Sequence, residues 1–110
     1  MKRLLAALAM MLFATCTAQA TEPLAQTYPG PWHRDFNRAI AQTLGANHVE
    51  NCGDLAYRAN PGQRGEYLVY CSADDGVWRV YLVWTATSKI MGPYPVDPSV
   101  PPPTPMIDLR

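Results

Sequence analysis

The sequence predicts an α+β domain in which one N-terminal helix packs on a three-stranded antiparallel β-meander. Apolar residues recur at helical spacing across 31–45, and short aromatic and β-branched segments alternate with turn residues across 52–84. Seven prolines fall in the last 18 residues, a composition that favours extended chain without a packed core. We therefore expect one disulfide-linked domain over 31–92, followed by a proline-rich flexible tail over 93–110.

The first 20 residues have the pattern of a secretory signal peptide. A basic start at 1–3 precedes an apolar run over 4–13, and Ala18-Gln19-Ala20 supplies small residues at a cleavage site. The run is too short for a permanent membrane span. Lipid attachment at Cys16 is the less favoured alternative, because the residue before it is threonine rather than a smaller one. The expected location is the periplasm or the medium.

Charge and cysteine content narrow the classes of partner. Removal of the signal peptide leaves seven basic and nine acidic residues in a chain of 90, a net charge near −2. Such a chain has no basic stripe for nucleic acid and no polybasic patch for a membrane surface. Two cysteines remain, and an even number in an exported chain indicates one disulfide. We therefore predict a bond between Cys52 and Cys71.

The predicted helix follows an extended lead-in over 21–30. Pro31 suits the first turn of a helix, and Gly45 is a suitable residue at its C-terminal end. Between them an apolar side chain recurs at every fourth position, which places these side chains on one face. This stripe consists of Trp32, Phe36, Ile40 and Leu44.

The predicted hairpin joins segments 52–59 and 66–72 through the loop Asn60-Pro-Gly-Gln-Arg-Gly65. Proline followed by glycine is typical of the centre of a type II turn. A turn centred on Pro61 and Gly62 places Cys52 directly opposite Cys71. The expected register and the expected disulfide therefore agree.

The second loop, Ala73-Asp-Asp-Gly76, leads into a third strand over 78–84, and a short edge segment at 89–91 follows. With three loop residues, Trp78, Val80, Leu82 and Trp84 share a face with Leu68 and Tyr70, whereas an even-length loop would move the side chains of the third strand to the other face. We expect the helix to cover one face, made of Leu55, Tyr57, Ala59, Leu68, Tyr70, Trp78, Val80, Leu82 and Trp84. The opposite face then holds Cys52, Asp54, Arg58, Tyr67, Val69, Cys71, Arg79, Tyr81 and Val83.

One helix covers only one face of a sheet, so the opposite face is the candidate binding site. It has an apolar centre and a polar rim, as interaction surfaces do. The sequence therefore favours a non-catalytic module that binds a protein partner or forms a homodimer; burial of this face by the tail or the lead-in is the competing interpretation. The candidate binding residues are Tyr67, Val69, Tyr81, Val83, Arg79 and Arg58.

Signals for catalysis or metal binding are weak. His33 and His48 stand at opposite ends of the predicted helix, roughly 22 Å apart if that helix continued. Asp74 and Asp75 precede a glycine, which is ordinary turn chemistry rather than a calcium loop. We expect no metal and no cofactor. A small hydrolase using His33 or His48, or an inhibitor of a secreted enzyme, remain the alternatives.

Overall fold

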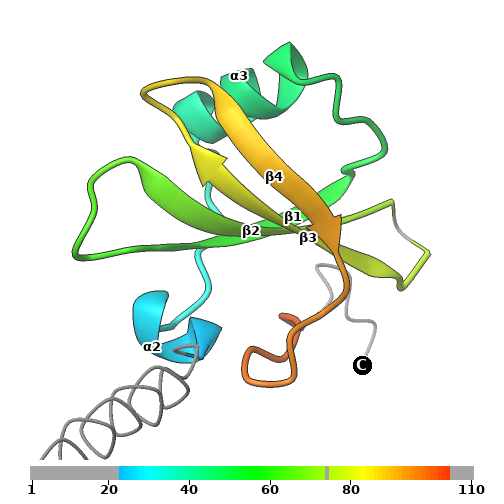
Figure 1. Cartoon of the computed structure of the whole chain (residues 1–110). Coiled ribbons are helices and arrows are strands. Elements are labelled where there is room, and N and C mark those ends of the chain that lie inside the picture. Colours follow the sequence, from blue (N-terminus) through cyan, green and yellow to red (C-terminus); the bar gives the residue numbers. More distant parts are fainter. Residues whose placement is uncertain (1–22, 74, 105–110) are drawn as a thin grey trace, which may run out of the picture.

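The computed structural model describes residues 23–73 and 75–104, which form a small α+β domain (Figure 1). Its four strands make one antiparallel sheet in the order β1-β2-β3-β4. The predicted α+β class is confirmed, and the sheet gains a full fourth strand where the sequence indicated only a short edge segment. The predicted signal peptide and Cys16 lie outside the described residues. The elements are α2 (Leu24–Thr27), α3 (Arg38–Ala46), β1 (Asp54–Ala59), β2 (Glu66–Ser72), β3 (Trp78–Trp84) and β4 (Lys89–Tyr94).

The helix α3 begins at Arg38, so the prediction of a start at Pro31 is wrong. Asn37 is its N-cap, and the Asn37 side chain accepts a hydrogen bond from the Ile40 N–H at 3.0 Å. The chain before it is extended, and His33 pairs with Tyr57 through two backbone hydrogen bonds of 2.9 and 3.0 Å. The first part of the expected apolar stripe therefore joins the edge of β1 instead of the helix.

The Cys52–Cys71 disulfide is present, with its α-carbons 5.0 Å apart. The predicted register of the first hairpin is wrong, however, because Leu55 and not Cys52 lies opposite Cys71. Cys52 precedes β1, which begins at Asp54, so its side chain reaches Cys71 from outside the paired strands. As a result Tyr57 lies opposite Val69, and the side chains of β1 lie on the faces opposite to those expected.

The pairing of β2 with β3 agrees with the prediction. Tyr70 lies opposite Val80 and Leu68 opposite Leu82, so these four side chains share one face. The strands are separated by residues 73–77, an odd number that preserves the expected alignment.

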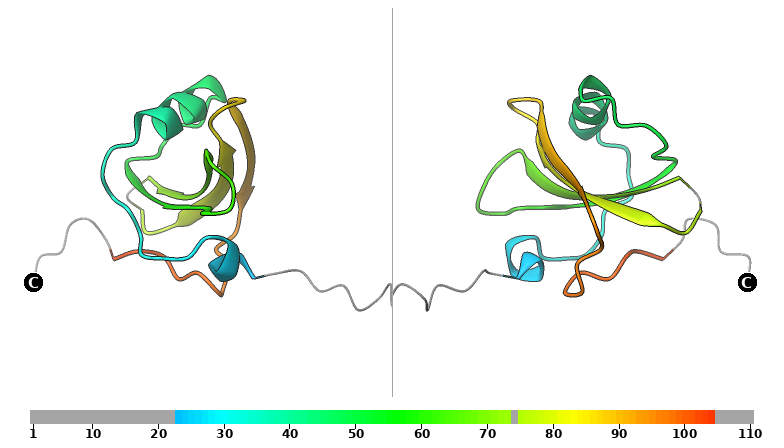
Figure 2. Two further views of the ribbon diagram at one scale, coloured as in Figure 1. Left: turned by 90° about the vertical axis from the view of Figure 1, so that its left-hand side faces the viewer. Right: turned by 45° about the vertical axis from the view of Figure 1, so that its right-hand side comes forward.

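Both faces of the sheet are covered, and α3 covers the face that was expected to be open (Figures 1 and 2). The other face, which was assigned to the helix, packs instead against α2, Trp32 and the C-terminal segment. The core under α3 contains Ile40, Leu44, Tyr57, Val69, Cys71, Tyr81 and Val83. The second core contains Tyr28, Leu68, Tyr70, Val80 and Val100.

The described part of the proline-rich segment is packed against this second face. The Tyr70 hydroxyl donates a hydrogen bond to the Val100 carbonyl at 2.7 Å, and Trp32 Nε1 donates to the Pro101 carbonyl at 3.1 Å. Val100 is fully buried. Residues 93–104 therefore belong to the packed domain rather than extending away from it, and 105–110 lie outside the described residues.

Candidate functional site

The predicted binding face is buried beneath α3. Val69 and Val83 have no exposed surface and Tyr81 is 7% exposed, because Ile40 and Leu44 of the helix pack on them. Tyr67 is half-buried, and its ring meets that of Tyr57 edge-on at 5.7 Å. This packing contradicts the expectation of an open apolar face.

The two predicted arginines are not brought together. Arg58 lies on the opposite face, where its guanidinium stacks over Trp32 at 4.4 Å and burial lowers its pKa. Arg79 lies opposite Cys71 in the sheet, on the side of the helix, and is half-buried. Arg58 therefore packs against the second core, and Arg58 and Arg79 lie on opposite faces of the sheet.

Both histidines are exposed, and each lies outside the helix. The imidazole of His33 stacks on the ring of Tyr57 at 5.4 Å. The Tyr57 hydroxyl donates to Asp35 Oδ2 at 3.0 Å, and burial together with this carboxylate raises the pKa of Tyr57. Within residues 23–73 and 75–104, no three His, Cys, Asp or Glu side chains come together as metal ligands.

The candidate site is a groove between α3 and the start of β1, with a cavity volume of about 440 Å³, which we call the α3–β1 groove. This volume is within the usual range for ligand pockets. Phe36 stands in its wall with 79% of its surface exposed, the most exposed large apolar side chain in the described chain. The apolar lining consists of Phe36, Ile40, Ala41, Leu44, Val49, Cys52 and Leu55, and the polar lining of Arg34, Asp35, Asn37 and Asp54.

The groove exposes an unpaired stretch of β1, which is an edge strand. The backbone groups of Tyr57 bond to His33 and hence point away from β2. Alternation along the strand makes those of Leu55 point the same way. In the described chain, neither the N–H nor the C=O of Leu55 has a hydrogen-bond partner on that side. The groove therefore contains a donor and an acceptor suited to an added strand.

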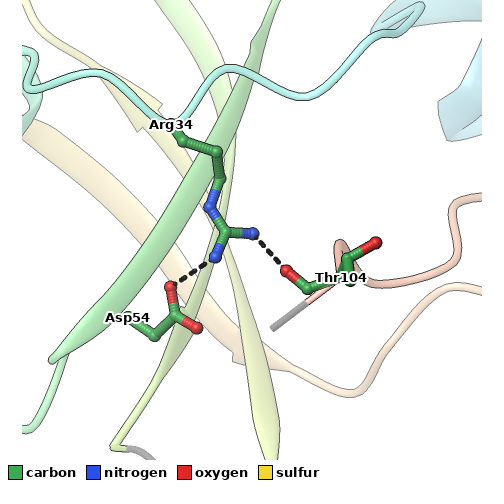
Figure 3. A network of polar contacts seen from close by, with 3 residues as sticks. All are labelled: Arg34, Asp54 and Thr104. Atoms are coloured by element: carbon green, nitrogen blue, oxygen red, sulfur yellow. Dashed lines mark hydrogen bonds and ion pairs between the residues drawn. The ribbon is translucent and has the colours of Figure 1, made fainter. Parts of the chain in front are cut away.

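Two of the residues that line the groove, Arg34 and Asp54, form an ion pair (Figure 3). Arg34 Nη2 lies 2.9 Å from Asp54 Oδ1, and Arg34 Nη1 donates to the Thr104 carbonyl at 2.9 Å. The side chains of Arg34 and Asp54 are 23% and 11% exposed, so the pair is largely shielded from water. It fastens the segment before α3 to both β1 and the end of the described tail.

A second cavity of about 580 Å³ lies between α2, strands β3 and β4, and residues 95–98. Pro23, the first described residue, forms part of its wall.

Sequence reasoning missed Phe36, Ala41 and Leu55 as groove residues. The useful signal was Asn37, since asparagine is among the preferred N-cap residues and a helix starting after it leaves Phe36 outside. Nothing local to Leu55 indicates that its backbone is unpaired, because that depends on where the chain leaves β1 after His33.

No helix in the described ranges has both the length and the apolar character needed to cross a membrane. Comparison with protein-family models, curated proteins and solved structures finds no match to this chain.

Proposed function

We propose that the protein is a small exported, non-catalytic binding module whose α3–β1 groove takes up an extended apolar segment of a protein partner. The observation that supports this is the unpaired backbone of Leu55 inside an apolar groove beside a helix. A peptide added to a sheet edge gains affinity from main-chain hydrogen bonds, and alternate side chains entering a groove give specificity. Both elements are available here.

The protein-binding role expected from the sequence is thus assigned to the α3–β1 groove, not to the sheet face that α3 covers. The face of Tyr81 and Val83 is occupied by the helix, whereas Phe36 remains exposed beside the groove. Export is supported by the signal-like first 20 residues and by the Cys52–Cys71 disulfide, which persists in oxidising compartments. No arrangement among the described residues favours the hydrolase or inhibitor alternatives over binding.

Two alanines on α3 provide a matched test. Ala41 lines the groove and Ala39 does not, and both are exposed. Peptides would be selected from a displayed library against the secreted protein, and their affinities measured by calorimetry. Ala41→Glu should weaken binding at least tenfold, because it places a charge among apolar groups. Ala39→Glu should change affinity less than twofold.

Selected peptides that bind both variants equally well would contradict the groove as the site. Failure to select any peptide, with the protein folded and its disulfide intact, would contradict peptide binding itself.

A further inference from the structure

We propose that the α3–β1 groove binds the N-terminal end of its partner's extended segment, with the free α-amino group of that segment beside the carboxylate of Asp35. The inference rests on the proposed function and deepens it, because it fixes which end of the bound segment the groove recognises and in which direction the segment runs. It is supported by the pairing already present on the edge of β1, by the point where the chain leaves that edge, and by the charges that line the groove.

The free position on β1 continues a ladder that the chain itself has begun. His33 and Tyr57 exchange both backbone hydrogen bonds, at 2.9 and 3.0 Å, in an antiparallel bridge. In an antiparallel ladder, the next pair that exchanges both bonds lies two residues away. On β1 that residue is Leu55. A segment added antiparallel to β1 therefore bonds to both the N–H and the C=O of Leu55 through one of its own residues.

The chain leaves this edge just before the free position. Two further residues of ladder after His33 would place Asp35 opposite Leu55, but the bridge at His33 is isolated and the chain turns toward α3 instead. A bound residue opposite Leu55 takes the place that Asp35 leaves. In an antiparallel segment the residue before it would meet Arg34, which follows His33 in the chain. The bound segment therefore begins at the residue opposite Leu55.

The groove presents a carboxylate at this end. Asp35 lines the groove and is exposed, and its Oδ2 accepts a hydrogen bond from the Tyr57 hydroxyl at 3.0 Å. Among the described residues no cation pairs with Asp35. The neighbouring Arg34 is already paired with Asp54 and also donates to the Thr104 carbonyl. The charge that remains is negative, which suits an ammonium group.

These charges also select the direction of the segment. An antiparallel segment that begins here places its α-ammonium group beside Asp35, whereas a parallel segment that ends here places its α-carboxylate there. Like charges brought together across an interface are unfavourable. The side chain of the first bound residue lies on the same face as Leu55, on the side of α3, where Leu55 packs against the apolar core. The partner is thus a protein with a free N-terminus and an apolar first residue.

The test uses a groove-binding peptide selected from a displayed library whose members begin at a free N-terminus. The peptide is synthesised with a free α-amino group, with an N-acetyl group, and with an amidated C-terminus, and calorimetry measures the affinity of each for the full chain. Acetylation should weaken binding by about tenfold or more, because it removes a charged donor and adds atoms in the path of Arg34. Amidation of the C-terminus should change affinity by less than about twofold, because that end lies away from Asp35.

Two matched carboxylate variants locate the amino group. Asp35→Asn removes the charge and keeps an acceptor for the Tyr57 hydroxyl. It should weaken binding of the free-amine peptide by about threefold or more and leave binding of the acetylated peptide unchanged. Asp75→Asn is the control, since Asp75 is exposed, accepts a hydrogen bond from the Val77 N–H and does not line the groove. It should leave the affinity for both peptides unchanged.

Equal affinities of the free-amine and acetylated peptides would overturn the proposal, and so would an effect of Asp35→Asn that is equal for both. If Ala41→Glu still weakened both peptides in that case, the groove would remain the binding site and only the recognition of an N-terminus would fail. The absence of any peptide whose binding responds to Ala41→Glu would instead remove the proposed function, and the recognition of an N-terminus with it.

Discussion

Arg34 and Asp54 form a shielded ion pair of 2.9 Å that joins the extended segment before α3 to the first residue of β1. Arg34→Ala should lower the free energy of unfolding by about 2 kcal/mol, because it leaves the Asp54 carboxylate poorly solvated and without its cation. Urea denaturation measures this. Arg34→Lys should recover only part of the loss, since one ammonium does not reproduce the planar fork that reaches both Asp54 and Thr104.

The reassigned sheet faces lead to a second prediction. Tyr81→Ala should lower stability by about 3 to 5 kcal/mol, because it empties a position packed under α3. Val77→Ala is the control, since Val77 is 54% exposed, and it should change stability by less than about 0.5 kcal/mol. A Tyr81 variant as stable as the Val77 variant would show that α3 does not cover this face in solution.

The contrast between the two hairpins shows what sequence patterning determines. The pairing of β2 with β3 was predictable because the loop has an odd number of residues, and any odd number gives the same faces. The pairing of β1 with β2 was not predictable in the same way. Proline followed by glycine indicates a turn centred on Pro61 and Gly62, but the loop in the structure is centred further along the chain. In the structure the Asn60 N–H bonds to the Glu66 carbonyl, so all of 61–65 lies in the loop and the register moves.

The helix shows a second limit of sequence patterning. Apolar residues do recur at every fourth position from Trp32 to Leu44, but the first and last of these side chains pack on different faces of the sheet. Ile40 and Leu44 pack from α3 onto one face of the sheet, whereas the ring of Trp32 lies 4.6 Å from the ring of Tyr70 on the other face. The spacing of apolar residues alone does not show which of them lie in the helix. The chain around His33 pairs with the edge of β1 at Tyr57, and this pairing keeps it out of the helix. The groove exists because the chain pairs with β1 at His33 and then leaves that edge before α3 begins, which the sequence pattern does not indicate.

The disulfide provides a third prediction. Cys71→Ser should lower stability by about 2 to 5 kcal/mol and prevent folding at body temperature, since the bond closes a loop of 19 residues in a small core. Thermal denaturation followed by circular dichroism measures the change. Reduction of the disulfide in the unaltered protein should lower its melting temperature by about as much as the Cys71→Ser substitution does. Two free thiols in the unreduced protein would contradict the pairing.

Phe36 allows function to be separated from stability. Because its side chain is 79% exposed, Phe36→Ser should change the free energy of unfolding by less than about 0.5 kcal/mol. If the groove binds peptides, the same change should weaken their binding by more than about 1 kcal/mol, as loss of an aromatic anchor commonly does. Calorimetric titration and urea denaturation of one preparation give both values. A variant that unfolds readily but still binds would contradict both assignments.

Buried tyrosines make the fold sensitive to alkali. Burial raises the pKa of Tyr28 above its ordinary value of 10.0, and the Glu66 carboxylate, which accepts a hydrogen bond from the Tyr28 hydroxyl, raises it further. Burial also raises the pKa of Tyr70. Above pH 10 the unfolded chain loses these protons first and binds fewer than the folded chain, so stability falls as pH rises.

We therefore expect the urea midpoint to be nearly constant from pH 7 to about 9 and to fall progressively above about pH 10. Tyr28→Phe should make this fall shallower, because it removes one group that ionises only on unfolding. Tyr94→Phe is the control, since Tyr94 is 40% exposed, and it should leave the slope unchanged. A fall of equal steepness in the Tyr28 and Tyr94 variants would show that Tyr28 ionises as readily in the folded protein as in the unfolded chain, and hence that its contact with Glu66 does not persist in solution.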